Sequence, residues 1–297
     1  MPAINNVKDT IGRRMAVNVV GIPGLLLFIW LGGWPYAALI CAVVLLGIRE
    51  YLALVAKLNL TPRPVPLYLA TALLLAVIIQ DAGLWEGPFS LYSQGLKFLA
   101  LAFILAMALQ ITEILNESAN PWMNFAANYV GFIWVAAFGG SFILVRQLEI
   151  PSLTMVGDLS FRITSALYVS VWVCDSLAYI CGKAWGKAKI LPAVSPNKTV
   201  VGTISGLVGA VVLMLILGLT GWLPMADINP GHLVVLGLIC GGLGQTGDFV
   251  QSRFKRDAGV KDSGKLLPGH GGILDRFDSL LYVMPAAYLY LELVILP

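Results

Sequence analysis

The most polar stretch of the chain is KDSGKLLPGHGGILDRFDS, residues 261–279, and it lies between long apolar segments. Its run PGHGG, residues 268–272, is rich in glycine, which lets backbone N–H groups approach an anion closely. Asp275 and Asp278 follow at a spacing that places both carboxylates on one side of a helix start. Together with the nearby lysines, these groups suit a magnesium-bound nucleotide. The glycine run alone would indicate only an ordinary turn.

Two further aspartates lie within apolar segments upstream. Asp175 is in VWVCDSLAYICG, and Asp248 is in GLGQTGDFVQSRFKR. At a rise of about 1.5 Å per residue, Asp175 lies about 10 Å inside the end of its predicted helix, and Asp248 lies several Å inside its own. Asp278 lies at the boundary of the next helix. We therefore expect three carboxylates at a similar depth beneath one basic surface.

Two interpretations of these aspartates are consistent with the cost of burying a carboxylate at membrane depth. That cost is roughly 2.5–3.5 kcal/mol on insertion scales, so such a group needs a cation or another partner. A structural ion pair with a nearby lysine would suffice for one isolated acid, whereas three converging acids favour a metal or ligand site. Asp248, Ser252 and Lys255, at i, i+4 and i+7, add a polar stripe on one helical face, with Arg256 beside it.

A second basic loop covers residues 182–199, GKAWGKAKILPAVSPNKT. Its Lys183, Lys187 and Lys189 could equally be lysines that only set the topology. The segment SPNKT, residues 195–199, is more specific, because it places hydroxyls and an amine where the next apolar segment begins. The N-terminus of a helix also favours an anion. This loop is therefore a second candidate source of phosphate contacts.

Composition determines the class of fold that must position these groups. Charged residues make up 12% of the 297 residues, against about 25% in soluble domains, and the mean hydropathy is +0.84. We therefore expect an all-α, polytopic integral membrane protein. A span needs about 20 mostly apolar residues. Nine segments qualify: residues 15–32, 35–56, 65–80, 96–115, 128–146, 163–181, 200–220, 232–252 and 278–296.

The placement of Lys and Arg predicts the orientation. With the N-terminus in the cytosol, fifteen of the 19 basic residues fall in inside segments, and Arg49 lies within the second span. Outside segments then carry only Lys97, Arg146 and Arg162. We therefore predict a cytosolic N-terminus and an outside C-terminus. The net charge of +3 does not indicate a nucleic-acid partner.

Three regions are expected along the chain. Residues 1–95 form N-terminal helices one to three, and residues 96–162 form helices four and five, a candidate dimer scaffold. Residues 163–297 form the catalytic helices six to nine with the two cytosolic loops. Near the end of the second span, Arg49 and Glu50 are interpreted as an internal ion pair.

Two groups of polar residues resemble conserved regions of the phosphatidate cytidylyltransferases, also called CDP-diacylglycerol synthases. The first group resembles the family signature: Ser252, Lys255, Arg256, Lys261, Asp262, Pro268, Gly269, His270, Gly271, Gly272, Asp275, Arg276, Asp278 and Ser279. The second resembles an upstream conserved region: Asp175, Ala178, Tyr179, Gly186, Lys187, Ser195, Pro196, Lys198 and Thr199. Two departures are Val200-Val201, where the family usually has an acid, and Gln251, where Glu is frequent. The first half of the chain is similar only as generic membrane helices.

The resemblance implies that CTP and phosphatidate give CDP-diacylglycerol and pyrophosphate. It implies that magnesium is held by Asp248 and Asp275, with potassium as a further candidate ion. The implied catalytic residues are Asp248, Lys255, Arg256, Lys261, Asp262, His270, Asp275 and Asp278. The implied substrate-binding residues are Asp175, Tyr179, Lys187, Ser195, Lys198, Thr199, Ser252, Gly269, Gly271, Gly272, Arg276 and Ser279. A homodimer in the cell inner (plasma) membrane, with its site facing the cytosol, is the corresponding expectation.

Two alternatives remain at the level of sequence. One is a CTP-dependent enzyme that acts on another lipid phosphate, such as an ether lipid. The other is a cation or phosphate transporter, which would need acids near the membrane midplane and, often, inverted repeats. The acids here are predicted near one membrane face and no repeat is evident, so the enzyme is favoured.

Overall fold

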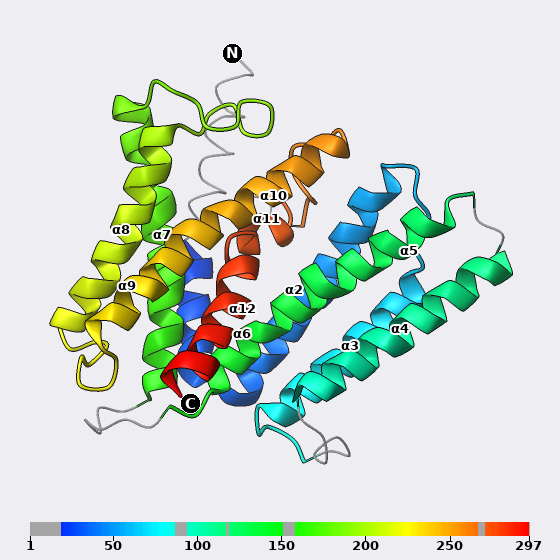
Figure 1. Ribbon diagram of the computed structural model, residues 1–297, viewed down its shortest axis with the longest axis horizontal. Coiled ribbons are helices and arrows are strands. Elements are labelled where there is room, and N and C mark those ends of the chain that lie inside the picture. Colours follow the sequence, from blue (N-terminus) through cyan, green and yellow to red (C-terminus); the bar gives the residue numbers. More distant parts are fainter. Residues whose placement is uncertain (1–18, 87–93, 117–118, 151–157, 267–270, 297) are drawn as a thin grey trace. The chain divides into compact units, whose positions relative to one another are not determined.

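The computed structural model describes residues 19–86, 94–116, 119–150, 158–266 and 271–296, which form helices and, across these ranges, no strand (Figure 1). Seven helices in them are long and apolar enough to cross a membrane: Gly33–Ala56, Pro64–Asp81, Leu99–Asn116, Pro121–Gln147, Leu159–Trp185, Val200–Leu219 and Pro230–Asp257. Two shorter apolar helices, Val19–Leu31 and Leu280–Ile295, coincide with the first and last predicted spans. The all-α, polytopic class is confirmed, while the count of nine spans stays a prediction.

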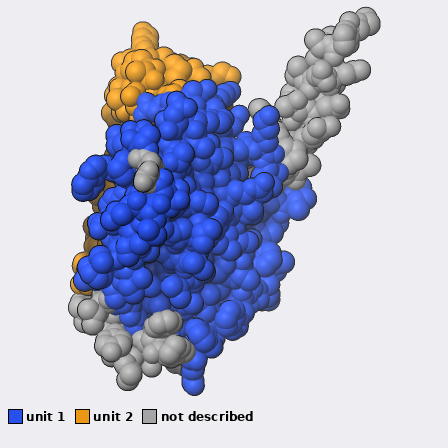
Figure 2. All heavy atoms as spheres, turned by 90° about the vertical axis from the view of Figure 1, so that its right-hand side faces the viewer, with its two compact units in different colours: residues 1–143, 257–277 blue, residues 144–256, 278–297 orange. Residues whose placement is uncertain are grey.

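The chain forms two compact units, which Figure 2 colours separately. The first unit comprises residues 1–143 and 257–277, and the second comprises residues 144–256 and 278–297. The loop segment 257–277 therefore belongs with the N-terminal helices. The division into functional regions expected from the sequence stays a prediction.

The first unit consists of apolar helices and one short helix from the polar stretch 261–279. Its elements are α2 (Gly33–Ala56), α3 (Pro64–Asp81), α4 (Gln94–Asn116), α5 (Pro121–Val130), the π-helix η1 (Gly131–Ala137) and α11 (Leu274–Phe277). α3 contacts α2 and α4, η1 contacts α2 and α3, and α11 contacts α2. Gly32, at φ +59°, separates helix Val19–Leu31 from α2, and Gly33, the first residue of α2, has φ +50°; both values favour glycine.

The second unit contains the helices that carry Asp175 and Asp248. Its elements are α7 (Leu159–Trp185), α8 (Val200–Leu219), α9 (Pro230–Leu238), the π-helix η2 (Ile239–Leu243), α10 (Gly244–Asp257), α12 (Leu280–Tyr290) and the π-helix η3 (Leu291–Ile295). α9, η2 and α10 follow one another without a break. α6 (Phe138–Gln147) contains the division between the units.

Small residues bring the helices of the second unit into backbone contact. The buried residues of α8 recur at every fourth position: Gly202, Gly206, Ala210, Met214 and Gly218. A Cβ atom on Gly202 would lie 2.5 Å from the carbonyl oxygen of Ala178 in α7. One on Gly241 would lie 2.7 Å from the Cα atom of Leu207 in α8. Membrane helices associate closely through such small residues, and here the contacts fix α7, α8 and η2 beside one another.

Candidate active site

A polar cavity of about 520 Å³ lies in the second unit, among α7, the loop before α8 and the first turns of α8 and α10. Its polar and charged lining residues are Asp175, Tyr179, Lys183, Lys189, Asn197, Lys198, Thr199, Thr203, Gln245 and Asp248. Five of the residues predicted for the site, Asp175, Tyr179, Lys198, Thr199 and Asp248, therefore line one cavity. The sequence indicated that Asp175 and Asp248 would lie near each other, because both were predicted at a similar depth along their helices.

Asp248 interacts with two polar side chains in this cavity wall. Its Oδ2 atom forms an ion pair with Lys198 Nζ. Its Oδ1 atom accepts a hydrogen bond of 3.2 Å from Ser252 Oγ, one turn further along α10. Lys198 Nζ also lies 4.2 Å from the centroid of the Phe249 ring, a cation–π distance. The predicted polar stripe of α10 is thus formed, and its partner is the lysine of the SPNKT segment.

Asp278 lies close to α10 as well. A Cβ atom on Gly247 would lie 2.5 Å from the carbonyl oxygen of Asp278. The Oδ1 atom of Asp278 accepts a hydrogen bond of 2.8 Å from the N–H group of Ser279. Asp278 therefore lies beside the helix that carries Asp248.

The carboxylates of the described residues are the candidate ligands for a metal ion. Within the ranges that the structure describes, no cluster of three or more His, Cys, Asp or Glu side chains is arranged to hold a metal ion. The hard oxygen donors of Asp248 still fit magnesium, because this ion is commonly held by one or two carboxylates, waters and substrate phosphates. A magnesium ion at Asp248 would therefore take further ligands from water and phosphate.

Thr199 acts as the N-cap of α8. Its backbone is extended, and its Oγ1 atom accepts a hydrogen bond of 3.1 Å from the N–H group of Gly202. A Cβ atom on Gly186 would lie 2.3 Å from the same Oγ1 atom. The Thr199 hydroxyl, expected from the sequence to contact substrate, is therefore also a structural group that fixes where α8 begins.

Removal of this cap gives a first prediction. We expect Thr199→Ala to lower the free energy of unfolding by about 0.5–2 kcal/mol, because the N–H group of Gly202 loses its acceptor. Thr199→Ser should retain most of that stability, because serine also caps helices. Thermal unfolding of the detergent-solubilised protein measures both, with Thr220→Ala at the opposite end of α8 as control. Equal losses in the serine and alanine variants would contradict the cap.

Asp275 is held by the backbone of its own loop in the first unit. Its Oδ2 atom accepts hydrogen bonds from the N–H groups of Ser263, at 2.8 Å, and Gly272, at 2.9 Å. Gly271 has φ +86°, and a Cβ atom there would lie 2.6 Å from Asp275 Oδ2. The glycine run was expected to present amides to phosphate. In its described part, the amide of Gly272 contacts a carboxylate of the protein instead.

Glu50 contacts the loop that carries Asp275, which the sequence did not indicate. This α2 side chain is buried and accepts hydrogen bonds from Ser263 Oγ at 3.0 Å and from the N–H groups of Ile273 and Leu274 at 2.9 Å each. It therefore binds the loop rather than pairing with Arg49. A Cβ atom on Gly264 would lie 2.4 Å from Glu50 Oε1, so glycine leaves room for the carboxylate. An acid within an apolar segment was the available signal.

The other predicted residues fall into three groups. Lys255 and Ser279 are buried in the second unit, where Ser195 accepts a backbone hydrogen bond from Lys198. Exposed side chains that do not line the polar cavity are Lys187, Arg256, Lys261, Asp262 and Arg276. Gly269 and His270 lie outside the described residues. Of the departures from the family pattern, Gln251 is fully buried, and Val200 and Val201 are both 37% exposed.

Comparison with known proteins decides the family. The model of the cytidylyltransferase family matches residues 12–294. The chain belongs to the cytidylyltransferase family. Phosphatidate cytidylyltransferases of Bacillus subtilis and Synechocystis are 34% and 31% identical to it, each over 95% of this chain and 97% of the relative. A phosphatidate cytidylyltransferase of Staphylococcus aureus is 36% identical over 73% of this chain and 75% of the relative. The match to the cytidylyltransferase family thus includes α2 and Glu50, in the half that the motifs did not cover.

Proposed function

We propose that this member of the cytidylyltransferase family is a CTP:phosphatidate cytidylyltransferase that forms CDP-diacylglycerol and pyrophosphate. Two relatives named phosphatidate cytidylyltransferase are similar to it over 95% of this chain. The structural observation that carries the proposal is the polar cavity in which Asp248, Lys198 and Asp175 meet at the ends of apolar helices. The charged side chains of this cavity can bind phosphate groups, and the apolar helices around it can contact the acyl chains of a lipid.

The chemistry requires two anions to meet. An oxygen of the lipid phosphate forms a bond to the α-phosphorus of CTP, and the bond from that phosphorus to the pyrophosphate oxygen breaks. Such transfers depend mainly on positioning and charge neutralisation. Lys198, Lys183 and Lys189 line the polar cavity and can hold phosphate oxygens there. Ser252 orients the Asp248 carboxylate through its hydrogen bond.

Magnesium is the proposed cofactor, with potassium as a second candidate ion. Asp248 would hold it, and by the family resemblance so would Asp275. The presence of Asp175 and Asp248 in one cavity supports a cation there, because a cation offsets the repulsion of two neighbouring carboxylates. When bound, a divalent ion neutralises phosphate charge and stabilises the leaving pyrophosphate. Lys198, which pairs with Asp248 in the structure, would then be able to contact a phosphate oxygen.

The proposed topology has nine spans, a cytosolic N-terminus and an outside C-terminus in the plasma membrane. Its support is the bias of basic residues toward the predicted cytosolic segments. Two of the three basic residues predicted outside are neutralised by ion pairs, Lys97 with Asp81 and Arg146 with Asp158. CTP then reaches the site from the cytosol while the lipid stays in the bilayer. We also propose that the protein works as a homodimer, as the resemblance implies.

The function is tested with the purified full-length protein, labelled CTP and lipid phosphates in mixed micelles. We expect labelled cytidine to enter lipid with phosphatidate, with one pyrophosphate released per cytidylyl group transferred. A parallel reaction with an ether-linked lipid phosphate separates the two enzyme alternatives by kcat/KM. Transfer to neither lipid, together with uptake of phosphate or a cation by proteoliposomes, would contradict the proposal and favour the transporter.

A further inference from the structure

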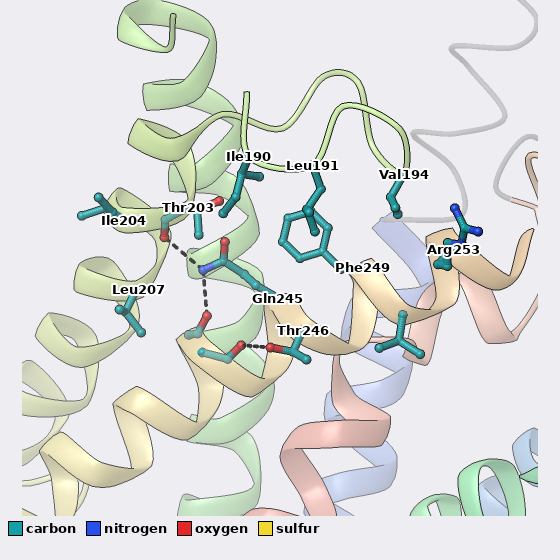
Figure 3. A pocket seen from close by; sticks show the side chains of 13 residues that line it. Ile190, Leu191, Val194, Thr203, Ile204, Leu207, Gln245, Thr246, Phe249 and Arg253 are labelled. Atoms are coloured by element: carbon teal, nitrogen blue, oxygen red, sulfur yellow. Dashed lines mark hydrogen bonds between the residues drawn. The ribbon is translucent and has the colours of Figure 1, made fainter. Parts of the chain in front are cut away.

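A second cavity, of about 580 Å³, lies in the second unit (Figure 3). Its lining is mostly apolar: Ile190, Leu191, Val194, Ile204, Leu207, Gly241, Gly242, Phe249 and Val250, with Thr203, Gln245, Thr246 and Arg253. Three of these apolar side chains come from the loop before α8, a segment that is otherwise basic. Apolar side chains on a loop at the membrane surface are more stable when other apolar groups cover them than when they face water.

The two cavities share a wall. Thr203 and Gln245 line both. Gln245 Nε2 donates hydrogen bonds to the carbonyl oxygens of Thr203, at 3.0 Å, and Gly241, at 2.7 Å, which fixes its side chain between α8 and η2. Phe249 lines the apolar cavity, while the Lys198 ammonium near its ring pairs with Asp248 of the polar cavity. A ligand across this wall would meet hydrocarbon on one side and charge on the other.

We propose that the apolar cavity binds an acyl chain of the lipid phosphate substrate, at carbons that dihexanoyl chains lack. This inference rests on the proposed function, which requires a lipid phosphate at the polar cavity. Of the two substrates, only the lipid has hydrocarbon to bury. Lys198 of the polar cavity complements its phosphate, and Arg253, which lines the apolar cavity, adds a second positive charge (Figure 3).

The position of Ile204 makes the cavity testable. Its side chain lines the cavity and is 56% exposed, so a larger residue can be accommodated without disturbing a buried core. Val208, one turn further along α8, is 53% exposed and is not among the lining residues. Ile204→Trp and Val208→Trp are therefore matched in helix and exposure, and they differ in whether they fill the cavity.

The experiment compares dioleoyl and dihexanoyl phosphatidate with the full-length enzyme in mixed micelles. Each buried methylene contributes roughly fourfold in affinity. We expect Ile204→Trp to raise the KM for dioleoyl phosphatidate about tenfold, because the indole displaces several chain methylenes. The KM for CTP and the KM for dihexanoyl phosphatidate should stay within about twofold of wild type. Val208→Trp should leave all three values unchanged.

A binding measurement separates this inference from the proposed function. Equilibrium binding of labelled dioleoyl phosphatidate without CTP should weaken about tenfold in Ile204→Trp, whether or not transfer occurs. Failure of the wild type to transfer cytidine would sink the proposed function alone. Equal effects of the two tryptophans, or equal effects on both chain lengths, would overturn the acyl site. A changed oligomeric state of Ile204→Trp with unchanged lipid binding would assign the surface to a second copy and also overturn it.

Discussion

Replacing Asp248 by asparagine should reduce kcat/KM for cytidylyl transfer by at least about 10²-fold while leaving the protein folded. The substitution retains the side-chain volume and the acceptor for Ser252, but it removes the negative charge that pairs with Lys198. Under the proposed mechanism it also removes a magnesium ligand. Steady-state kinetics with labelled CTP measures the loss, and thermal unfolding verifies the fold.

A purely structural ion pair is the competing explanation for Asp248, and a double substitution distinguishes it. If the aspartate only neutralises Lys198, then Asp248→Asn should lower the unfolding temperature and Asp248→Asn combined with Lys198→Met should restore it, because no uncompensated charge remains. If the carboxylate holds the metal, Asp248→Asn should raise the magnesium concentration needed for half-maximal transfer, whereas Lys198→Met should not, because it leaves the carboxylate in place. Asp257→Asn, at the exposed end of the same α10 helix, removes an acid outside the polar cavity and is the matched control.

The similar depth of Asp175 and Asp248 could be predicted from the sequence, because the number of residues from the end of a helix gives the distance along its axis. Asp175 and Asp248 lie in separate apolar segments at similar distances from basic loops, and they do line one cavity. The predicted seventh span, residues 200–220, coincides with α8, Val200–Leu219. In both cases the information is local, because helical rise and capping act over a few residues.

Partners distant in the sequence were not predictable. Asp248 and Lys198 are 50 residues apart, and periodicity alone does not show which of several lysines faces which acid. Glu50 and Ser263 are separated by 213 residues, so nothing local in α2 indicates that its acid binds a loop. The glycine run 268–272 is predicted to present amides to an anion, and this stays a prediction. Gly264 and Gly272 leave room for the Glu50 carboxylate, a contact that the sequence does not indicate because the two segments are far apart in the chain.

Glu50→Gln should lower kcat at least about tenfold, because it loosens the loop that carries Asp275. All three groups that contact the Glu50 carboxylate are donors, whereas glutamine presents one oxygen and a donor amide of its own. Each buried N–H group left without an acceptor costs about 1–3 kcal/mol. A displacement of about 1 Å at a reacting centre can cost about 10²-fold in rate. Hydrogen exchange at the amides of Ile273 and Leu274, followed by mass spectrometry, should be faster in the variant.

Two comparisons show whether Glu50 positions the loop or only stabilises the first unit. Ser263→Ala removes one of the three donors and should produce a smaller effect in the same direction. Glu113→Gln removes another buried acid of this unit, the ion-pair partner of Arg63, and should lower stability without faster exchange at 273–274. If Glu50→Gln reduced only the unfolding temperature, with kcat and local exchange as in wild type, its role would be structural. Because the carboxylate contacts the amides directly before Asp275, we expect exchange and kcat to change together.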